Sequence, residues 1–302
     1  MISRALFVAF SGGPRDGRLR WEAEALAASG AVVDVLCLRE KGEKAVEVVR
    51  GARYIRLPVR RPRGGLVRDA LGQLAFFLLA FAAASVLAIR RRYGLLHAHG
   101  APDLLVLCGF LHRLRGTRVL LDLGVPSPER HRAMFGAAVR PSLVRVLEGA
   151  EAFSIGCADR VLTGSEEFRR ALIGRRIDPS KVVVSAATPG LDAPASASDA
   201  AARGSASHDL VCRGSLVREG ALDTLFWALA RLRREIPGVR LHVLEDPDAC
   251  PEASHIARAL SLAGVVIRHA CPAPDGEREI IRRASIGIVP DGRNPLSDGS
   301  FP

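Results

Sequence analysis

Short apolar runs alternate with helical stretches along the first part of the chain. Residues 6–10 form the first predicted strand, a glycine-containing turn and a helix over 19–29 follow, and 32–38 is the next strand. Further strands are predicted at 54–57, 95–98, 119–121, 160–163 and 181–184. This alternation predicts a parallel sheet that is covered by helices on both faces.

The same pattern resumes after a stretch of different composition. Residues 188–207 are rich in Ala, Ser, Pro and Gly, which predicts a flexible linker. Beyond it, strands are predicted at 209–212, 239–244, 265–268 and 286–289, with helices at 222–235, after Pro251 and at 276–283. We therefore expect an α/β chain with two Rossmann-like parallel-sheet domains, the second incomplete. The predicted boundaries are 1–188, a linker over 189–207, and 208–302.

A long apolar segment interrupts the first half. Residues 74–89 hold a single weakly polar side chain, with Arg68 on one side and Arg90, Arg91 and Arg92 on the other. The segment is shorter than the about 20 residues that a bilayer span needs. A helix buried in the domain, a helix that lies in the membrane interface with its arginines on anionic headgroups, and a true span all remain open.

Composition narrows the class of partner. The formal net charge of +11 favours an anionic partner, but two Trp and two Tyr leave few side chains that could stack on bases. We therefore expect no nucleic-acid partner. The six cysteines are scattered without a C-x-x-C pair, which indicates reduced core residues, no disulfides and no zinc site. The N-terminus reads as a strand and lacks the features of a signal peptide, so we expect a cytoplasmic location.

Two stretches carry candidate chemistry. Gly12 and Gly13 lie in the turn after the first strand, where backbone N–H groups can approach an anion. The turn does not match the dinucleotide fingerprint, and an ordinary tight turn is the alternative. His97 and His99 follow a strand, and they share one side only if that strand continues to His99. A pair of buried structural histidines is the alternative there. Metal binding lacks support because no carboxylate lies close in the sequence.

Acidic residues reach the same predicted sheet edge. Asp122 closes the next strand, and Glu129 follows it shortly afterwards. The carboxyl ends of parallel strands are where open α/β sheets bind ligands.

Six segments, in order, resemble the family-four-like GT-B glycosyltransferases. They are DGRLRWEAEALAASGAVVDVL, LLHAHGAPDLLVLCG, LLDLGVPSPE, CADRVLTGSEEFRRAL with KVVVSAATPGLD, DLVCRGSLVREGALDTLFWALARL, and RRASIGIVPDGRNPLSDGSFP. The resemblance implies a GT-B fold and metal-independent, retaining transfer of a sugar from a nucleotide-sugar donor. It implies no cofactor besides that donor, which is a substrate.

The resemblance also implies roles for individual residues. His99 corresponds to the family's histidine near the reacting sugar and is the candidate catalytic residue. Donor-phosphate binding is implied for Arg213, Ser215 and Arg218. The remaining candidates for substrate binding are Gly12, Gly13, Arg18, Asp122, Glu129 and Ser165.

The chain departs from the family pattern in three places. Asp122-Leu123-Gly124-Val125 stands where D-x-H-D is expected, the Arg/Lys clamp for the diphosphate is displaced, and the segment with the family's acidic donor residues is absent. We therefore expect a truncated or diverged glycosyltransferase whose acceptor is lipid-linked or a cell-surface polysaccharide. A catalytically silent GT-B-like protein that binds a glycan or a partner is the alternative.

Overall fold

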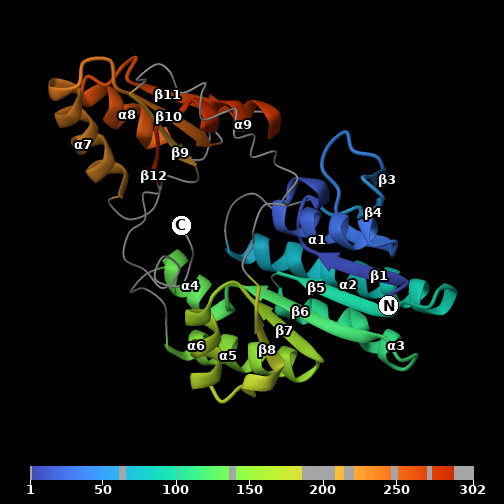
Figure 1. Cartoon of the computed structure of the whole chain (residues 1–302). Helices are drawn as coiled ribbons and strands as arrows, with labels where there is room; N and C mark the ends of the chain where they lie inside the picture. Colours follow the sequence, from blue (N-terminus) through green and yellow to red (C-terminus); the bar gives the residue numbers. More distant parts are fainter. Residues whose placement is uncertain are drawn as a thin grey trace. The chain divides into compact units, whose positions relative to one another are not determined.

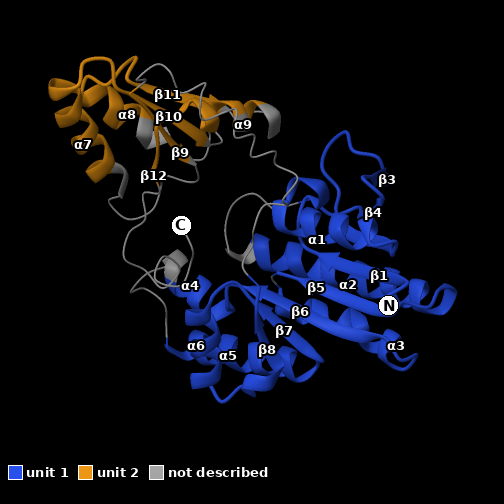
Figure 2. Ribbon diagram, viewed as in Figure 1, with its two compact units in different colours: residues 1–193, 294–301 blue, residues 194–293, 302 orange. Residues whose placement is uncertain are grey.

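The computed structural model describes residues 2–60, 66–100, 102–135, 141–185, 208–213, 221–245, 251–270 and 274–288. The chain divides into two compact units, which Figures 1 and 2 show. Unit 1 comprises residues 1–193 with 294–301, and unit 2 comprises 194–293 with 302. The predicted linker over 189–207 lies outside the described residues, so the predicted domain boundaries stay a prediction.

Unit 1 is built on an eight-stranded sheet with the order β3-β4-β2-β1-β5-β6-β7-β8. All neighbouring strands are parallel except β3, which runs antiparallel to β4. The sequence pattern missed β3, a short edge strand with a half-exposed side-chain pattern. The strands are β1 (Arg4–Ala9), β2 (Val32–Leu38), β3 (Val46–Val49), β4 (Ala52–Leu57), β5 (Leu95–His99), β6 (Arg118–Gly124), β7 (Arg160–Thr163) and β8 (Val182–Val184).

Helices connect these strands and cover the sheet (Figure 1). The α-helices are α1 (Gly17–Ala28), α2 (Leu66–Arg90), α3 (Phe110–Arg113), α4 (Ser127–Phe135), α5 (Pro141–Gly156) and α6 (Glu166–Gly174). Short 3-10 helices η1 (Gly13–Arg15), η2 (Asp103–Gly109) and η4 (Pro179–Lys181) complete the unit. Asp16 caps α1 because its carboxylate accepts the backbone N–H of Leu19, as expected for an N-cap residue.

Alternation along the strands divides the core of unit 1 into two halves. Leu6 and Val8 of β1 pack with Phe76 and Ala80 of α2, whereas the intervening Phe7 belongs to a second apolar cluster. This second cluster includes Leu19 and Ala23 of α1. Since successive side chains of a strand point to opposite faces, α1 and α2 cover opposite faces of the sheet.

Helix α2 is apolar on both of its sides. Every fourth residue from Phe76 is buried against the core, and this stripe consists of Phe76, Ala80, Ala84 and Ala88. The exposed stripe consists of Leu71, Leu74, Leu78, Val86 and Ile89, which are 47–72% exposed. The helix has 25 residues and extends the predicted segment at its N-terminal end. Within the described residues, this is the one helix that is long and apolar enough to cross a membrane.

Unit 2 contains a smaller, wholly parallel sheet with the order β11-β10-β9-β12. Phe226 and Leu229 of its first helix pack against Leu241 and Val243 to form its core. The described elements are β9 (Asp209–Arg213), α7 (Ala221–Glu235), β10 (Arg240–Glu245), α8 (Pro251–Ala259), β11 (Val266–Ala270), α9 (Pro274–Arg283) and β12 (Ile286–Ile288). The prediction of an α/β chain with two parallel sheets, the second smaller, is thus confirmed.

Candidate functional site

The order of strands in unit 1 reverses at β1 and β5. The chain moves from β1 outward to β2 and β4 on one side, and from β5 outward to β6 and β7 on the other. At such a switch point, the connections that leave the carboxyl ends of the two central strands diverge and make room for a ligand. The turn with Gly12 and Gly13 leaves β1 here, and Gly100 follows β5 at the same edge.

Both histidines of β5 lie on the face that α1 covers. The strand continues through His99, which fulfils the condition under which the two imidazoles share one side. His97 pairs with Phe7 of β1 and His99 with Ala9, and both partners belong to the α1-side apolar cluster. The two rings have centroids 5.9 Å apart.

Strand β6 brings Asp122 beside His99. The two residues are register partners, so their side chains leave the sheet on the same face. Asp122 is 1% exposed, and one of its carboxylate oxygens, Oδ1, accepts the backbone N–H of Gly124 at 2.9 Å. The other oxygen, Oδ2, lies 3.2 Å from Nδ1 of His99 and 3.8 Å from Nε2 of His97.

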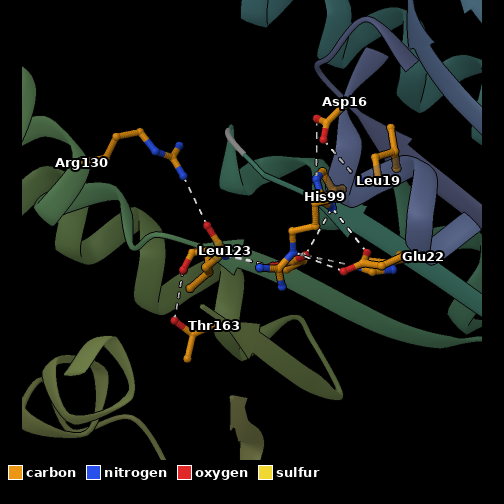
Figure 3. Close-up of polar contacts among 11 residues, drawn as sticks. Asp16, Leu19, Glu22, His99, Leu123, Arg130 and Thr163 are labelled. Atoms are coloured by element: carbon orange, nitrogen blue, oxygen red, sulfur yellow. Dashed lines mark hydrogen bonds and ion pairs between the residues drawn. The ribbon is translucent and has the colours of Figure 1, made fainter. Parts of the chain in front are cut away.

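Helix α1 adds charged side chains from above this edge (Figure 3). Nε of Arg18 donates to Oδ2 of Asp122 at 2.9 Å and to Oε1 of Glu22 at 3.2 Å. Oε2 of Glu22 lies 3.7 Å from both Nε2 of His97 and Nδ1 of His99. We call Glu22, His97, His99 and Asp122 the α1-side cluster. One ligand atom from each of these residues falls within 4.8 Å of the others.

The protonation of this cluster follows from burial and from charge. Burial alone lowers the pKa of His99, but the contact with Asp122 and the charges of Asp16 and Glu22 outweigh it, so that pKa is raised. Burial alone raises the pKa of Asp122, yet its contacts with the two histidines and the charge of Arg18 hold it well below the usual range. Asp122 is therefore a carboxylate at neutral pH.

The glycine turn requires glycine at one of its two positions. Gly13 has a φ of +64°, and a Cβ there would lie 2.9 Å from Sγ of Cys37 and 3.1 Å from the ring of Tyr54. Gly12 has an ordinary φ of −72°. The turn thus packs tightly onto the edge where His99 ends its strand.

Glu129 and Ser165 lie in unit 1, but their polar atoms are engaged within the protein. Ser165 caps α6 by accepting the backbone N–H of Phe168 at 3.2 Å. Glu129, on α4, accepts from Nη1 of Arg175 at 2.6 Å and from Nη2 at 3.2 Å. Arg175 also donates to Glu151 at 2.8 Å. We call Glu129, Glu151 and Arg175 the Arg175 cluster.

In unit 2, Arg213 ends the central strand β9. The strand order reverses between β9 and β12, so Arg213 also stands at a switch point. Ser215 and Arg218, the other candidates for donor-phosphate binding, lie outside the described residues.

Sequence reasoning brought His99, Asp122 and Arg18 to the same site but missed Glu22, and it gave His97 no role in binding. The one signal for Glu22 is its spacing of four residues from Arg18, which places both side chains on one side of α1. Figure 3 shows Glu22 and Asp16 on either side of His99.

Comparisons with known proteins define the class. The structure is similar to the sucrose-phosphate synthase from Thermosynechococcus elongatus (TM-score 0.73, 19% identity, 97% of this chain and 77% of that one). It is also similar to the catalytic domain of starch synthase IV from Arabidopsis thaliana bound to ADP and acarbose (TM-score 0.66, 13% identity, 98% and 79%). The third similar structure is that of HepE from Anabaena with UDP-glucose (TM-score 0.62, 17% identity, 95% and 73%). The fold is therefore that of the GT-B glycosyltransferases.

The family match is more specific than the fold. Residues 17–187 match the glycosyl transferase 4-like domain, which is more than half of the chain. The chain therefore belongs to this family, and it is a nucleotide-sugar glycosyltransferase, as its sequence resemblance indicates. A comparison with curated protein sequences gives no significant match.

Proposed function

We propose that this glycosyltransferase transfers a sugar, with retention at the anomeric carbon, to a lipid-linked or cell-surface polysaccharide acceptor at the cytoplasmic side of a membrane. The observation that carries the proposal is the exposed apolar stripe of α2, because this stripe lies on the same unit as the α1-side cluster. An enzyme with such a surface can meet an acceptor that does not leave the membrane. Retention and the cytoplasmic side rest on the sequence alone.

A nucleotide sugar is the donor in this proposal. HepE and starch synthase IV, which share the fold, were solved with UDP-glucose and with ADP. In this chain, the position of Arg213 at the switch point of unit 2 supports a contact with the donor phosphates. Ser215 and Arg218 complete the proposed phosphate contacts. Gly12 and Gly13 would offer backbone N–H groups to the donor from unit 1, and no further cofactor is proposed.

We assign the catalytic role to His99. Its ring is 9% exposed at the carboxyl edge, and Nε2 lies 3.8 Å from Asp16, on the opposite side of the ring from Asp122. A hydrogen bond from this ring to the reacting sugar positions the substrate for transfer. Asp122 and Arg18 hold the ring in place, and Glu129 and Ser165 support the surrounding loops, from which they reach the acceptor only indirectly.

The membrane contact follows from the two sides of α2. Burying the exposed stripe in a lipid interface removes five large apolar side chains from water, at about 25 cal/mol per Å². Arg90 and Arg92 at the end of the helix add attraction to anionic headgroups. Arg91 contributes less to this attraction because it pairs with the buried Asp34 at 3.3 Å.

A transfer assay tests the proposed function. The protein is incubated with labelled UDP- and GDP-sugars and with a membrane lipid extract, and the label is followed into lipid and into polysaccharide. We expect incorporation that depends on the extract, because the acceptor is supplied there. Binding of a nucleotide sugar without release of the nucleotide under any of these conditions would favour the silent glycan-binding alternative.

Flotation with vesicles tests the membrane contact separately. We expect the protein to float with anionic vesicles and to release at high salt, since part of the attraction is electrostatic. The variant Leu78→Ser should weaken flotation, whereas Val146→Ser, which changes an exposed apolar residue of α5, is the matched control. Equal flotation of both variants would show that α2 is not the contact surface.

A further inference from the structure

The α1-side cluster has the donor atoms of a metal site. Two imidazole nitrogens and two carboxylate oxygens face one another, with measured separations of 3.2 Å, 3.7 Å, 3.7 Å and 3.8 Å. In a tetrahedral site with ligand distances of about 2.0–2.1 Å, neighbouring donor atoms lie about 3.3–3.4 Å apart. Shifts of a few tenths of an ångström would bring these four atoms to that geometry.

Three of the four atoms lack a well-directed hydrogen bond. Among the described residues, no hydrogen-bond partner reaches Oε2 of Glu22, Nε2 of His97 or Nδ1 of His99, although all three atoms are inaccessible to water. His97 is 3% exposed and points into the cluster. Buried polar atoms are normally satisfied, so three that face one common point indicate a missing partner. A cation at that point would satisfy all three.

The surroundings match those of metal-ligating histidines. Such a histidine usually presents its second ring nitrogen to a carboxylate, which fixes the orientation of the ring. Nε2 of His99 lies 3.8 Å from Oδ2 of Asp16, while Nδ1 faces the cluster. The other oxygen of Asp16 caps α1, so this carboxylate is held in place.

We propose that Glu22, His97, His99 and Asp122 bind one divalent transition-metal ion of the Zn²⁺ type. Two imidazoles with two carboxylates suit such an ion, whereas Mg²⁺ and Ca²⁺ prefer six or more oxygen ligands. Four protein donors fill a tetrahedral shell, which is the arrangement of a structural site. The ion would fasten α1 to the ends of β5 and β6. This proposal goes beyond the transferase activity and does not depend on it.

Arg18 sets the affinity of the site. Its Nε contacts Oδ2 of Asp122 at 2.9 Å and Oε1 of Glu22 at 3.2 Å, so its positive charge lies beside the two anionic ligands. A neighbouring positive charge opposes cation binding. Removal of this charge should therefore tighten binding, an effect that an arginine with a purely structural role would not produce.

Metal binding can be measured without an activity assay. The full chain, freed of any histidine tag and of metal by a chelator, is dialysed against Zn²⁺ and analysed for bound metal. Co²⁺ is then used as a spectroscopic probe. We expect one ion per chain, visible absorption bands typical of tetrahedral Co²⁺, and a higher melting temperature with metal, because binding to the folded state stabilises it.

Ligand variants locate the site. His97→Gln and Glu22→Gln should each weaken binding by about 10–100-fold or more. Glu24→Gln is the matched control on the same helix, because Glu24 pairs with Arg20 and Arg50 outside the cluster. Glu22 is 24% exposed and its replacement leaves the core intact, so this variant remains informative if His97→Gln fails to fold. Circular dichroism of the metal-free proteins checks their folding.

Arg18→Gln completes the test. We expect it to bind Zn²⁺ about fivefold more tightly or better. Absence of stoichiometric binding to the wild-type chain would overturn the proposal. Binding that His97→Gln and Glu22→Gln leave unchanged would also overturn it, because the ion would then lie elsewhere. The His242–His269 pair of unit 2, whose ring nitrogens are 2.9 Å apart, is one such place.

Discussion

The α1-side cluster and the Arg175 cluster are both buried polar groups of unit 1, but their atoms are partnered differently. In the Arg175 cluster every carboxylate oxygen accepts a hydrogen bond, three from Arg175 and one from the backbone of Ser127. In the α1-side cluster, three atoms that face one another have no such partner among the described residues. A satisfied network stabilises a fold, whereas unsatisfied atoms that converge are available for a ligand. This difference separates the structural cluster from the functional one.

The largest expected effect on stability comes from the Arg175 cluster. Arg175→Met leaves Glu129 and Glu151 buried without a cation, and breaking a buried ion pair in this way typically costs about 3–5 kcal/mol. The free energy of unfolding by urea measures this cost. Arg169→Met is the control, because Arg169 pairs with Glu166 at the surface and should change stability by less than about 0.5 kcal/mol. Similar losses for both variants would refute the structural role of the Arg175 cluster.

A smaller loss is expected in the α1-side cluster. Asp122→Asn keeps the shape of the side chain and one acceptor, but it weakens the charged contact with Arg18, which is worth about 1.5–3 kcal/mol. Glu22 remains within reach of Arg18 and limits the cost. The same urea titration checks this value, with Glu24→Gln as the control. If Asp122→Asn cost more than Arg175→Met, the contrast between the two clusters would be wrong.

The smallest effect is a dependence of stability on pH. Burial, together with the charges of Asp103 and Glu129, raises the pKa of Glu151 to about 7 despite the nearby Arg175. Between pH 5 and 7 the folded protein therefore binds a proton at Glu151 that the unfolded chain has lost. The contribution of Glu151 to stability is full below its unfolded pKa and falls as the pH rises to 7.

We expect the melting temperature to fall by about 2–4 °C across this range, which is the shift that about 1 kcal/mol produces in a domain of this size. Glu151→Gln should flatten the decline. Parallel curves for the variant and the wild type would assign the pH dependence to other groups.

Local pattern predicted most of the strands, and it predicted His99 and Asp122 at one sheet edge. Alternation fixes which face a strand residue occupies, and the carboxyl ends of parallel strands meet at one edge, so these residues could be placed without a structure. Glu22 could not be placed this way because it reaches the histidines through the packing of α1, and its distance along the chain hides the contact. The absence of a nearby carboxylate in the sequence therefore led to the expectation of no metal ligand.

Helix α2 shows a second limit of the sequence. Its apolar residues occur on all sides, so their spacing does not indicate which of them face the sheet. The structure shows that the smaller alanines pack with Phe76 on the core, while the larger Leu, Val and Ile side chains remain outside. A helix that was wholly buried and one lying in the membrane interface were both compatible with the sequence. The exposed stripe now favours the interface.

The most direct test of the account is the transfer rate of His99→Gln. Removing one preorganised contact to the reacting sugar should lower the rate by about 10²–10³-fold. The melting temperature without added metal should change by only a few degrees, and Glu24→Gln should transfer at the wild-type rate. If His99→Gln transfers sugar as fast as the wild type, the α1-side cluster is not the catalytic site, and the assignment of function to its unsatisfied atoms is wrong.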